Sequence, residues 1–218
     1  ITTYKYHPYG LQGFRDDVIA NIDEWQSKGF AWYGHDQLTH AWRTPWDTHV
    51  RYEELMSPLA MTVIGLINNH SGGVDKGWWL KECWISEYTN GSAANKHNHD
   101  VNSMGWSFCY YIKMPDEGPG FTVCDNVNSA NHQLNVAEGD LLLFRHPLDH
   151  QVFPALDRRI IVSGNVVESN FVQEFHTRRY YNPTIIEDLN TEENDVDIDD
   201  WQKSIIDQKY NLNTQSGY

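Results

Sequence analysis

The sequence predicts a mainly β protein: a double-stranded β-helix (jelly roll) core with N-terminal helices packed on one face. Two stretches with helical spacing of apolar residues come first, and short apolar runs separated by Gly-, Pro- and Asp-rich turns follow. The chain has 218 residues, enough for one sizeable core. We expect a single domain over residues 1–175, with a helical part at 1–75 and a β core at 76–170, and an acidic C-terminal extension at 176–218.

Two amphipathic helices are expected before the strands. Residues 11–28 carry apolar residues at three- and four-residue steps, and Gly29 is placed to end the helix. Residues 30–47 have no clear period, which indicates an ordered loop or short strands. A second helix is expected over residues 49–69, and Pro58 would kink it or divide it in two. Each apolar face requires a sheet to cover it.

The strands are expected from residue 78 onward. Turn residues separate the runs at 115–120 (PDEGPG) and 137–140 (AEGD), as hairpin and strand connections require. This pattern is typical of an antiparallel double sheet. The runs read WWLKECWISEY, GWSFCYYIKM, GFTVCD, NHQLNV, DLLLF, QVFP and RRIIVSGNVVES.

Composition and cysteine spacing indicate which binding partners and which cellular compartment to expect. The formal charge of −14, from 30 acidic and 16 basic residues, would repel a phosphate backbone, so we expect no nucleic-acid partner. Cys83, Cys109 and Cys124 lie in expected strands without CxxC spacing, which indicates reduced core thiols in a cytoplasmic protein. No signal-peptide pattern and no apolar run of about 18 residues is visible, so we expect no membrane partner. The surplus of Trp and Tyr could cover a homodimer contact.

Three histidines form a candidate metal site. His97 and His99 in the run NKHNHD stand at i and i+2, which places them on the same side of an extended backbone. His150 follows the apolar run DLLLF, which would carry it to the end of the sandwich. Three imidazoles there could close a facial metal site and leave positions for substrate or oxygen. His146 is interpreted as a loop residue, and the alternative for the whole run HPLDH is a surface loop with exposed histidines.

A polar stripe begins at Arg159. Alternation places Arg159, Ser163 and Asn165 on one face of the last strand, together with Ile161, and Ile160 and Val162 on the other. Polar side chains inside a sandwich are costly unless they meet a charged partner. A guanidinium beside a hydroxyl suits a carboxylate, because its fork donates two parallel hydrogen bonds. Arg158 faces the other way and is the better candidate for pairing with a surface carboxylate.

From Trp84 to Val166 these motifs resemble the Fe(II)/2-oxoglutarate-dependent oxygenases, especially the branch with an H-x-H pair in its first motif. The resemblance rests on the runs NKHNH, CYYIKMP, GDLLLFRHPLDHQVFP and RRIIVSGN. It implies Fe(II) and 2-oxoglutarate as cofactors, O2 as a reactant, and hydroxylation of a small molecule or a protein side chain.

The resemblance also implies roles for particular residues. Iron would bind His97, His150 and His99 or a substitute, and Arg159, nine residues after His150, would bind the 5-carboxylate of 2-oxoglutarate. Two serines could supplement that contact, and two aromatic residues of the next strand would face the substrate. The serines are Ser163 and Ser86, and the aromatic residues are Trp106 and Tyr110.

One departure from the family leaves alternatives open. Most members have H-x-D or H-x-E, whereas here the second position is His99 and a carboxylate, Asp100, comes one residue later. Iron could therefore be held by three histidines, by His97 and His150 with Asp100 brought in by a bulge, or by two histidines and water; strand alternation favours the first. The spacing of Gly91, His97 and His99 also resembles the cupins, so a three-histidine enzyme without 2-oxoglutarate is the second hypothesis. A metal-free structural jelly roll is the third.

Overall fold

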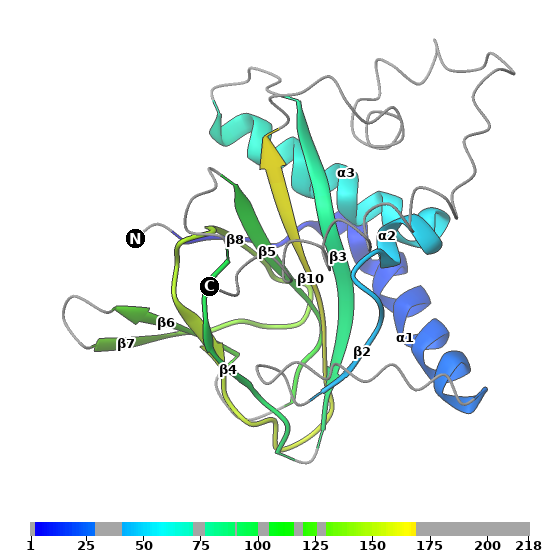
Figure 1. The fold of residues 1–218 in the computed structure, drawn as a ribbon. Coiled ribbons are helices and arrows are strands. Elements are labelled where there is room, and N and C mark those ends of the chain that lie inside the picture. Colours follow the sequence, from blue (N-terminus) through cyan, green and yellow to red (C-terminus); the bar gives the residue numbers. More distant parts are fainter. Residues whose placement is uncertain are drawn as a thin grey trace, which may run out of the picture. The chain divides into compact units, whose positions relative to one another are not determined.

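The computed structural model describes residues 3–28, 41–71, 77–89, 91–99, 105–115, 120–125 and 130–168. In these residues the strands form two antiparallel sheets on opposite sides of a shared interior, as expected for a jelly roll (Figure 1). The larger sheet has the order β1 (Thr3–Tyr6), β8 (Leu141–Arg145), β5 (Trp106–Lys113), β10 (Arg159–Glu168), β3 (Trp78–Tyr88) and β2 (Trp42–Arg43). The smaller sheet has the order β4 (Ala94–His97), β9 (His150–Val152), β6 (Phe121–Asp125) and β7 (Ala130–Leu134).

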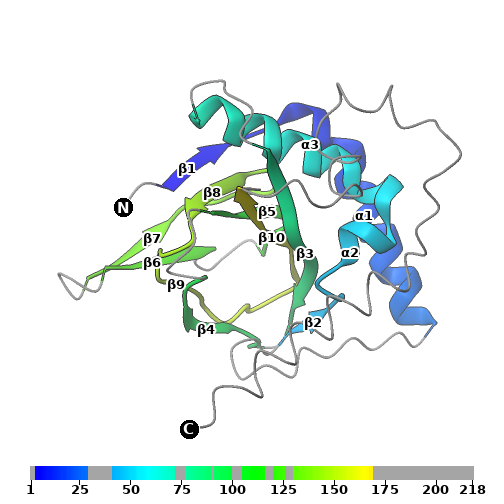
Figure 2. The ribbon, with the colours of Figure 1, turned by 45° about the horizontal axis from the view of Figure 1, so that its top comes forward.

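Helices cover the outer face of the larger sheet, as the amphipathic patterns predict (Figure 2). They are α1 (Gln12–Ser27), after a short 3-10 turn η1 (Tyr9–Leu11), then α2 (Thr48–Arg51) and α3 (Glu53–His70). The second expected helix is divided at Tyr52, whose φ of −128° and ψ of 55° leave the helical region, and not at Pro58. Pro58 lies inside α3, so the expectation of a break or kink at the proline is replaced by a break six residues earlier.

The two faces of the larger sheet bury different clusters. Ile160 and Val162 of β10 pack with the helices, whereas Ile161 packs into the interior between the sheets. This is the alternation expected from the sequence. Because both faces of β10 are covered, its first eight residues are all buried, including Arg159, Ser163 and Asn165.

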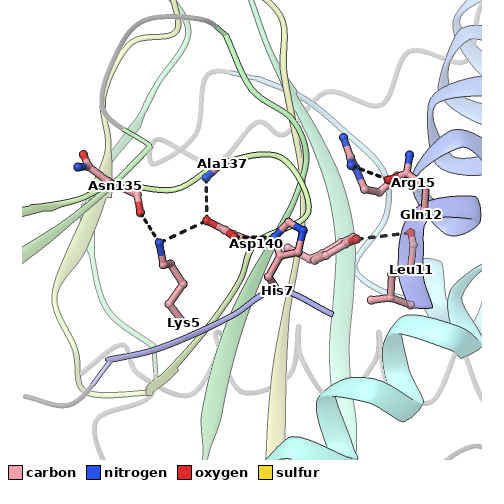
Figure 3. A network of polar contacts seen from close by, with 9 residues as sticks. Lys5, His7, Leu11, Gln12, Arg15, Asn135, Ala137 and Asp140 are labelled. Carbon is pink, nitrogen blue, oxygen red and sulfur yellow. Dashed lines mark hydrogen bonds and ion pairs between the residues drawn. The ribbon is translucent and has the colours of Figure 1, made fainter. Parts of the chain in front are cut away.

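Residues 1–75 were expected to form a helical part, but they also contain strands. Strand β1 pairs with β8, and β2 pairs with β3. A polar network beside β1 fixes this arrangement: Asp140 Oδ1 lies 3.0 Å from His7 Nδ1, and Asp140 Oδ2 lies 3.6 Å from Lys5 Nζ (Figure 3). Asp140 Oδ2 also accepts a hydrogen bond from the Ala137 N–H at 2.8 Å, in a turn where Gly139 adopts a φ of +85°. The N-terminal strand is thereby tied to the connection that enters β8.

Some expectations fall on other parts of the chain. The acidic extension at 176–218 and most of the turn at 115–120 lie outside the described residues. Cys83, Cys109 and Cys124 are free and buried, as expected. None of the described helices is long and apolar enough to cross a membrane.

Candidate metal centre

The three expected histidines lie together at the edge of the smaller sheet. His97 ends β4 and His150 begins β9, and the two residues stand directly opposite each other in the antiparallel pair. His99, two residues beyond His97, donates its backbone N–H to the His146 carbonyl at 2.9 Å. One ring nitrogen from each histidine lies within 4.8 Å of the other two, so these side chains could hold a metal ion.

Backbone carbonyls orient two of the rings. His97 Nδ1 lies 2.7 Å from the Asn95 carbonyl oxygen, and His150 Nδ1 lies 2.9 Å from the Leu148 carbonyl oxygen. A carbonyl only accepts hydrogen bonds, so each Nδ1 carries the proton and donates it. The lone pair therefore lies on Nε2, which is the arrangement that holds a metal-binding histidine in place.

The electrostatic environment keeps two of the three histidines, His99 and His150, uncharged. Burial, and then the neighbouring His97 and His99, lower the pKa of His150 well below its usual value. Burial lowers the pKa of His99 to about 3, and His97 and His146 add to the effect. Neutral imidazole is the form that binds a metal, so no proton has to be displaced from His99 or His150 near pH 7.

Two residues that flank His97, Lys96 and Asn98, both contact Asp149. Asn98 Nδ2 donates to Asp149 Oδ1 at 2.5 Å, and Lys96 Nζ lies 3.4 Å from Asp149 Oδ2. Since side chains alternate along an extended chain, holding Lys96 and Asn98 outward turns His97 and His99 inward. Asp149 immediately precedes His150, so one turn braces both parts of the cluster.

The histidines open into a pocket of about 420 Å³, part of which is open solvent. Ser107, Cys109 and Ser163 of the larger sheet contribute to its lining. Cys109 Sγ lies 3.5 Å from Ser163 Oγ, and Ser107 Oγ donates to Asn165 Oδ1 at 2.8 Å. Burial raises the pKa of Cys109 to about 11, so it stays a thiol at neutral pH. These side chains are small and polar, which leaves room for a bound molecule next to the rings.

Arg159 lies on the same face of β10 as Ser163 and is fully buried. Its Nη1 donates to the Phe153 carbonyl at 3.0 Å, and its Cζ lies 6.0 Å from the Tyr88 ring centroid. Burial lowers the pKa of Arg159, an effect opposed by Tyr111 and Tyr88. The Tyr111 hydroxyl is buried without a hydrogen-bond partner among the described residues. The Arg159 guanidinium and the Tyr111 hydroxyl thus lie in the same part of the interior.

The remaining expected site residues fall into two groups. Ser86 is fully buried and stands opposite Ile161, two pairs along from Tyr88 and Arg159, and Ser163 lies in the pocket wall. Trp106 and Tyr110 do not line the pocket: both belong to the cluster under the helices, where the Tyr110 ring packs against Phe14. The expectation that they face the substrate is corrected by the register of β5, which turns its odd-numbered residues inward.

Sequence reasoning did not select Tyr111, misplaced His146 and correctly gave Arg158 a carboxylate partner. Tyr111 is adjacent to Tyr110, and only the inward face of β5 distinguishes the two. His146 is buried at 2% exposure, although the sequence suggested a loop residue. Arg158 pairs with Glu87 at 2.7 Å and with Asp23 at 2.5 Å, the carboxylate role expected for it.

Comparison with known proteins supports the fold and not a sequence family. No protein-family model and no curated protein sequence matches the chain. Solved structures do match: a prolyl hydroxylase from Trichoplax adhaerens in complex with a peptide fragment of the hypoxia inducible factor oxygen degradation domain has a TM-score of 0.61 and 15% identity, covering 76% of this chain and 83% of that one. The non-heme alpha ketoglutarate dependent epimerase SnoN from nogalamycin biosynthesis has a TM-score of 0.63 and 10% identity, over 77% and 76%.

A third similar structure contains a metal ion and 2-oxoglutarate. HygX from Streptomyces hygroscopicus, solved with nickel, 2-oxoglutarate and hygromycin B bound, has a TM-score of 0.56 and 12% identity, over 78% of this chain and 84% of that one. The chain therefore has the jelly-roll fold of the 2-oxoglutarate-dependent Fe(II) oxygenases. At these identities the likeness concerns the fold alone.

Proposed function

We propose that this protein is an Fe(II)- and 2-oxoglutarate-dependent oxygenase. The observation that carries the proposal is the joint presence, between the same two sheets, of three convergent histidines and a buried arginine. His97 and His150 lie on the smaller sheet, His99 lies two residues beyond the end of its strand β4, and Arg159 lies on the larger sheet. A divalent metal ion with nitrogen ligands and a dicarboxylate would be matched by these two features together.

The residues present fit both cofactors. Two Nε2 lone pairs are oriented by carbonyls, and the low pKa values of His99 and His150 keep those ligands neutral. The buried guanidinium of Arg159 could donate two parallel hydrogen bonds to a carboxylate of the cosubstrate. The Tyr111 hydroxyl could donate a further hydrogen bond to it.

Within this proposal each residue has a separate task. The three histidines hold Fe(II), and Arg159 with Tyr111 and Ser86 binds the far carboxylate of 2-oxoglutarate. Ser163 contacts the bound molecules from the side of the pocket that faces the histidines. When bound, Fe(II), 2-oxoglutarate and O2 supply the oxidising power for the substrate, with succinate and CO2 formed from the cosubstrate. The protein positions the reactants and excludes water.

Hydroxylation of a small molecule or a protein side chain is the proposed reaction. The similar structures include a prolyl hydroxylase with a peptide and a protein with hygromycin B, so both substrate types occur on this fold. They also include an epimerase, and the fold therefore does not decide the reaction. The small polar residues Ser107, Cys109 and Ser163 would face the substrate.

The test measures succinate formed from 2-oxoglutarate by protein loaded anaerobically with Fe(II) and then exposed to air. Arg159→Met, which keeps the side-chain volume, should abolish succinate formation and leave the metal content intact. Arg158→Met is the matched control, because the neighbouring arginine pairs with the buried Glu87 and the exposed Asp23 and does not line the pocket, so the variant should retain turnover. Unchanged turnover in Arg159→Met would show that the assignment is wrong.

A three-histidine metal enzyme without 2-oxoglutarate is the second candidate. It is favoured by one observation: the ligand cluster found among the described residues consists of three histidines. Asp100, the alternative ligand, lies outside the described residues. Metal-dependent oxidation that proceeds equally well without 2-oxoglutarate would support it against the first proposal.

A further inference from the structure

His146 holds the part of the chain that carries His99. It lies in the turn after β8, four residues before His150, and is 2% exposed. Its carbonyl accepts the backbone N–H of His99 at 2.9 Å, and its own N–H donates to the Gly105 carbonyl at 3.3 Å. Residues 99 and 105 border the segment 100–104, so the same residue is bonded to both borders. His99 lies beyond the end of β4 and gains its backbone contact here.

The side chain of His146 adds a second attachment. Its Nε2 lies 2.9 Å from the Trp106 carbonyl oxygen, which only accepts, so this nitrogen carries the proton. Nε2 is thereby used for the start of β5, and His146 is not part of the ligand cluster. The ring centroid of His146 lies 6.0 Å from that of His99.

Gly105 is shaped to accept this ring. A Cβ atom at residue 105 would lie 2.1 Å from Cε1 and 2.5 Å from Nδ1 of His146, far inside contact distance. Glycine at 105 therefore allows the imidazole to pack directly on the backbone that leads into β5. The ring, the Trp106 carbonyl and the His99 backbone form one connected set of contacts.

We infer that His146 is a positioning residue that fixes His99 as the third ligand of the metal site. The inference rests on the proposed metal-binding function and goes beyond it, because it gives a role to a histidine outside the ligand cluster found among the described residues. Removing the ring frees the His146 peptide to shift, and His99 shifts with it. Residues that orient metal ligands from the outer shell typically change metal affinity by about 10- to 100-fold when they are replaced.

The test uses Co(II) as the probe, because its visible absorption reports the ligands around it. His146→Leu removes the bond to Trp106 but keeps much of the volume, and Gly105→Ala displaces the ring without changing His146. We expect both variants to bind Co(II) about 10- to 100-fold more weakly and to give an altered absorption spectrum. His146→Gln, which keeps a donor for the Trp106 carbonyl, should restore most of the affinity and the wild-type spectrum.

His49→Leu is the matched control for general destabilisation. His49 is also a buried histidine, but it lies on α2 at the outer side of the larger sheet. It should lower the unfolding temperature and leave the spectrum unchanged. Wild-type affinity and spectrum in both His146→Leu and Gly105→Ala, or an equal loss in His49→Leu, would overturn the role of His146. If wild-type protein bound no Co(II), or bound it no more tightly than His150→Ala, the metal site itself would fail.

Discussion

At the scale of single residues, the proposed metal site differs by one side chain from the H-x-D or H-x-E pair of most members of the family that the sequence resembles. His99 stands where those members have a carboxylate, so the three proposed ligands are all imidazoles. A metal ion held by them keeps its full double positive charge before any cosubstrate binds. Such a centre should attract a dicarboxylate strongly, and it depends on the geometry of three imidazoles rather than on charge pairing.

Replacing His99 tests whether it is a ligand. His99→Leu should weaken Fe(II) binding by more than about 100-fold, since even outer-shell changes cost about 10- to 100-fold. His99→Asp should keep one Fe(II) per chain, because a carboxylate at the same position restores the commoner ligand set. Competition with a coloured chelator measures both affinities. Wild-type affinity in His99→Leu would instead favour a site completed by Asp100 or water.

A second residue-scale prediction concerns pH and His49, which lies away from the metal site. Burial lowers its pKa to about 4, although Asp47 and Glu82 act in the opposite direction. Because the folded pKa lies below the unfolded value near 6.5, the unfolded chain takes up the proton first on acidification. The stability due to neutral His49 is complete above pH 6.5 and falls by about 3 kcal/mol towards pH 4.

Urea unfolding at several pH values checks this prediction. The difference in unfolding free energy between wild type and His49→Leu should shrink as the pH falls from 7 to 4, because the variant lacks this titration. A difference that is constant over the range would mean that the pKa of His49 is not lowered by folding.

At the scale of elements, the sequence predicted β10 better than β5. In β10 the polar residues alternate with aliphatic ones, and the stripe from Arg159 to Asn165 indeed lies on one face. In β5 seven of the eight residues are buried, with Trp106 and Tyr110 under the helices and Tyr111 against the interior. Large aromatic residues occur on both faces of β5, so residue type alone did not distinguish Trp106 and Tyr110 from Tyr111.

Other features depended on contacts far apart in the sequence. The division of the second helix at Tyr52, the short strand β1 and the burial of His146 follow from tertiary packing that spacing alone does not encode. The histidine cluster was predictable because the i, i+2 rule fixes two ligands and a strand end supplies the third.

The close pairing of β10 with β3 gives an element-scale prediction. A Cβ atom at Gly164 would lie 2.6 Å from the Glu82 carbonyl oxygen of β3 and 2.5 Å from the Phe108 ring. Gly164→Ala should therefore destabilise the protein by about 1–3 kcal/mol, as overpacking does. Gly65→Ala on the exposed side of α3, where nothing lies within 4 Å, should stabilise it by about 0.5–1 kcal/mol. Chemical denaturation compares the two, and equal effects would contradict the assigned packing.

At the scale of the whole molecule, the site joins the two sheets. The three histidines belong to the smaller sheet and the segment that continues β4, whereas Arg159 belongs to the larger sheet. The smaller sheet consists of short strands, and its edge strand β4 pairs only with β9 among the described strands. A metal ion would tie β4 to β9, and a cosubstrate held by both the metal and Arg159 would connect the sheets.

Thermal unfolding with each ligand tests this connection. Metal at about 100 times its dissociation constant should stabilise the folded protein by about 2.7 kcal/mol. That corresponds to a rise of several degrees in unfolding temperature for a chain of this size. Adding 2-oxoglutarate should raise the temperature further only when metal is present, because one end of the molecule requires the metal and the other requires Arg159. In Arg159→Met the metal increment should remain and the 2-oxoglutarate increment should be lost, while His150→Ala should lose both. Stabilisation by 2-oxoglutarate that persists in His150→Ala without metal would mean that the two sheets are not joined through this site.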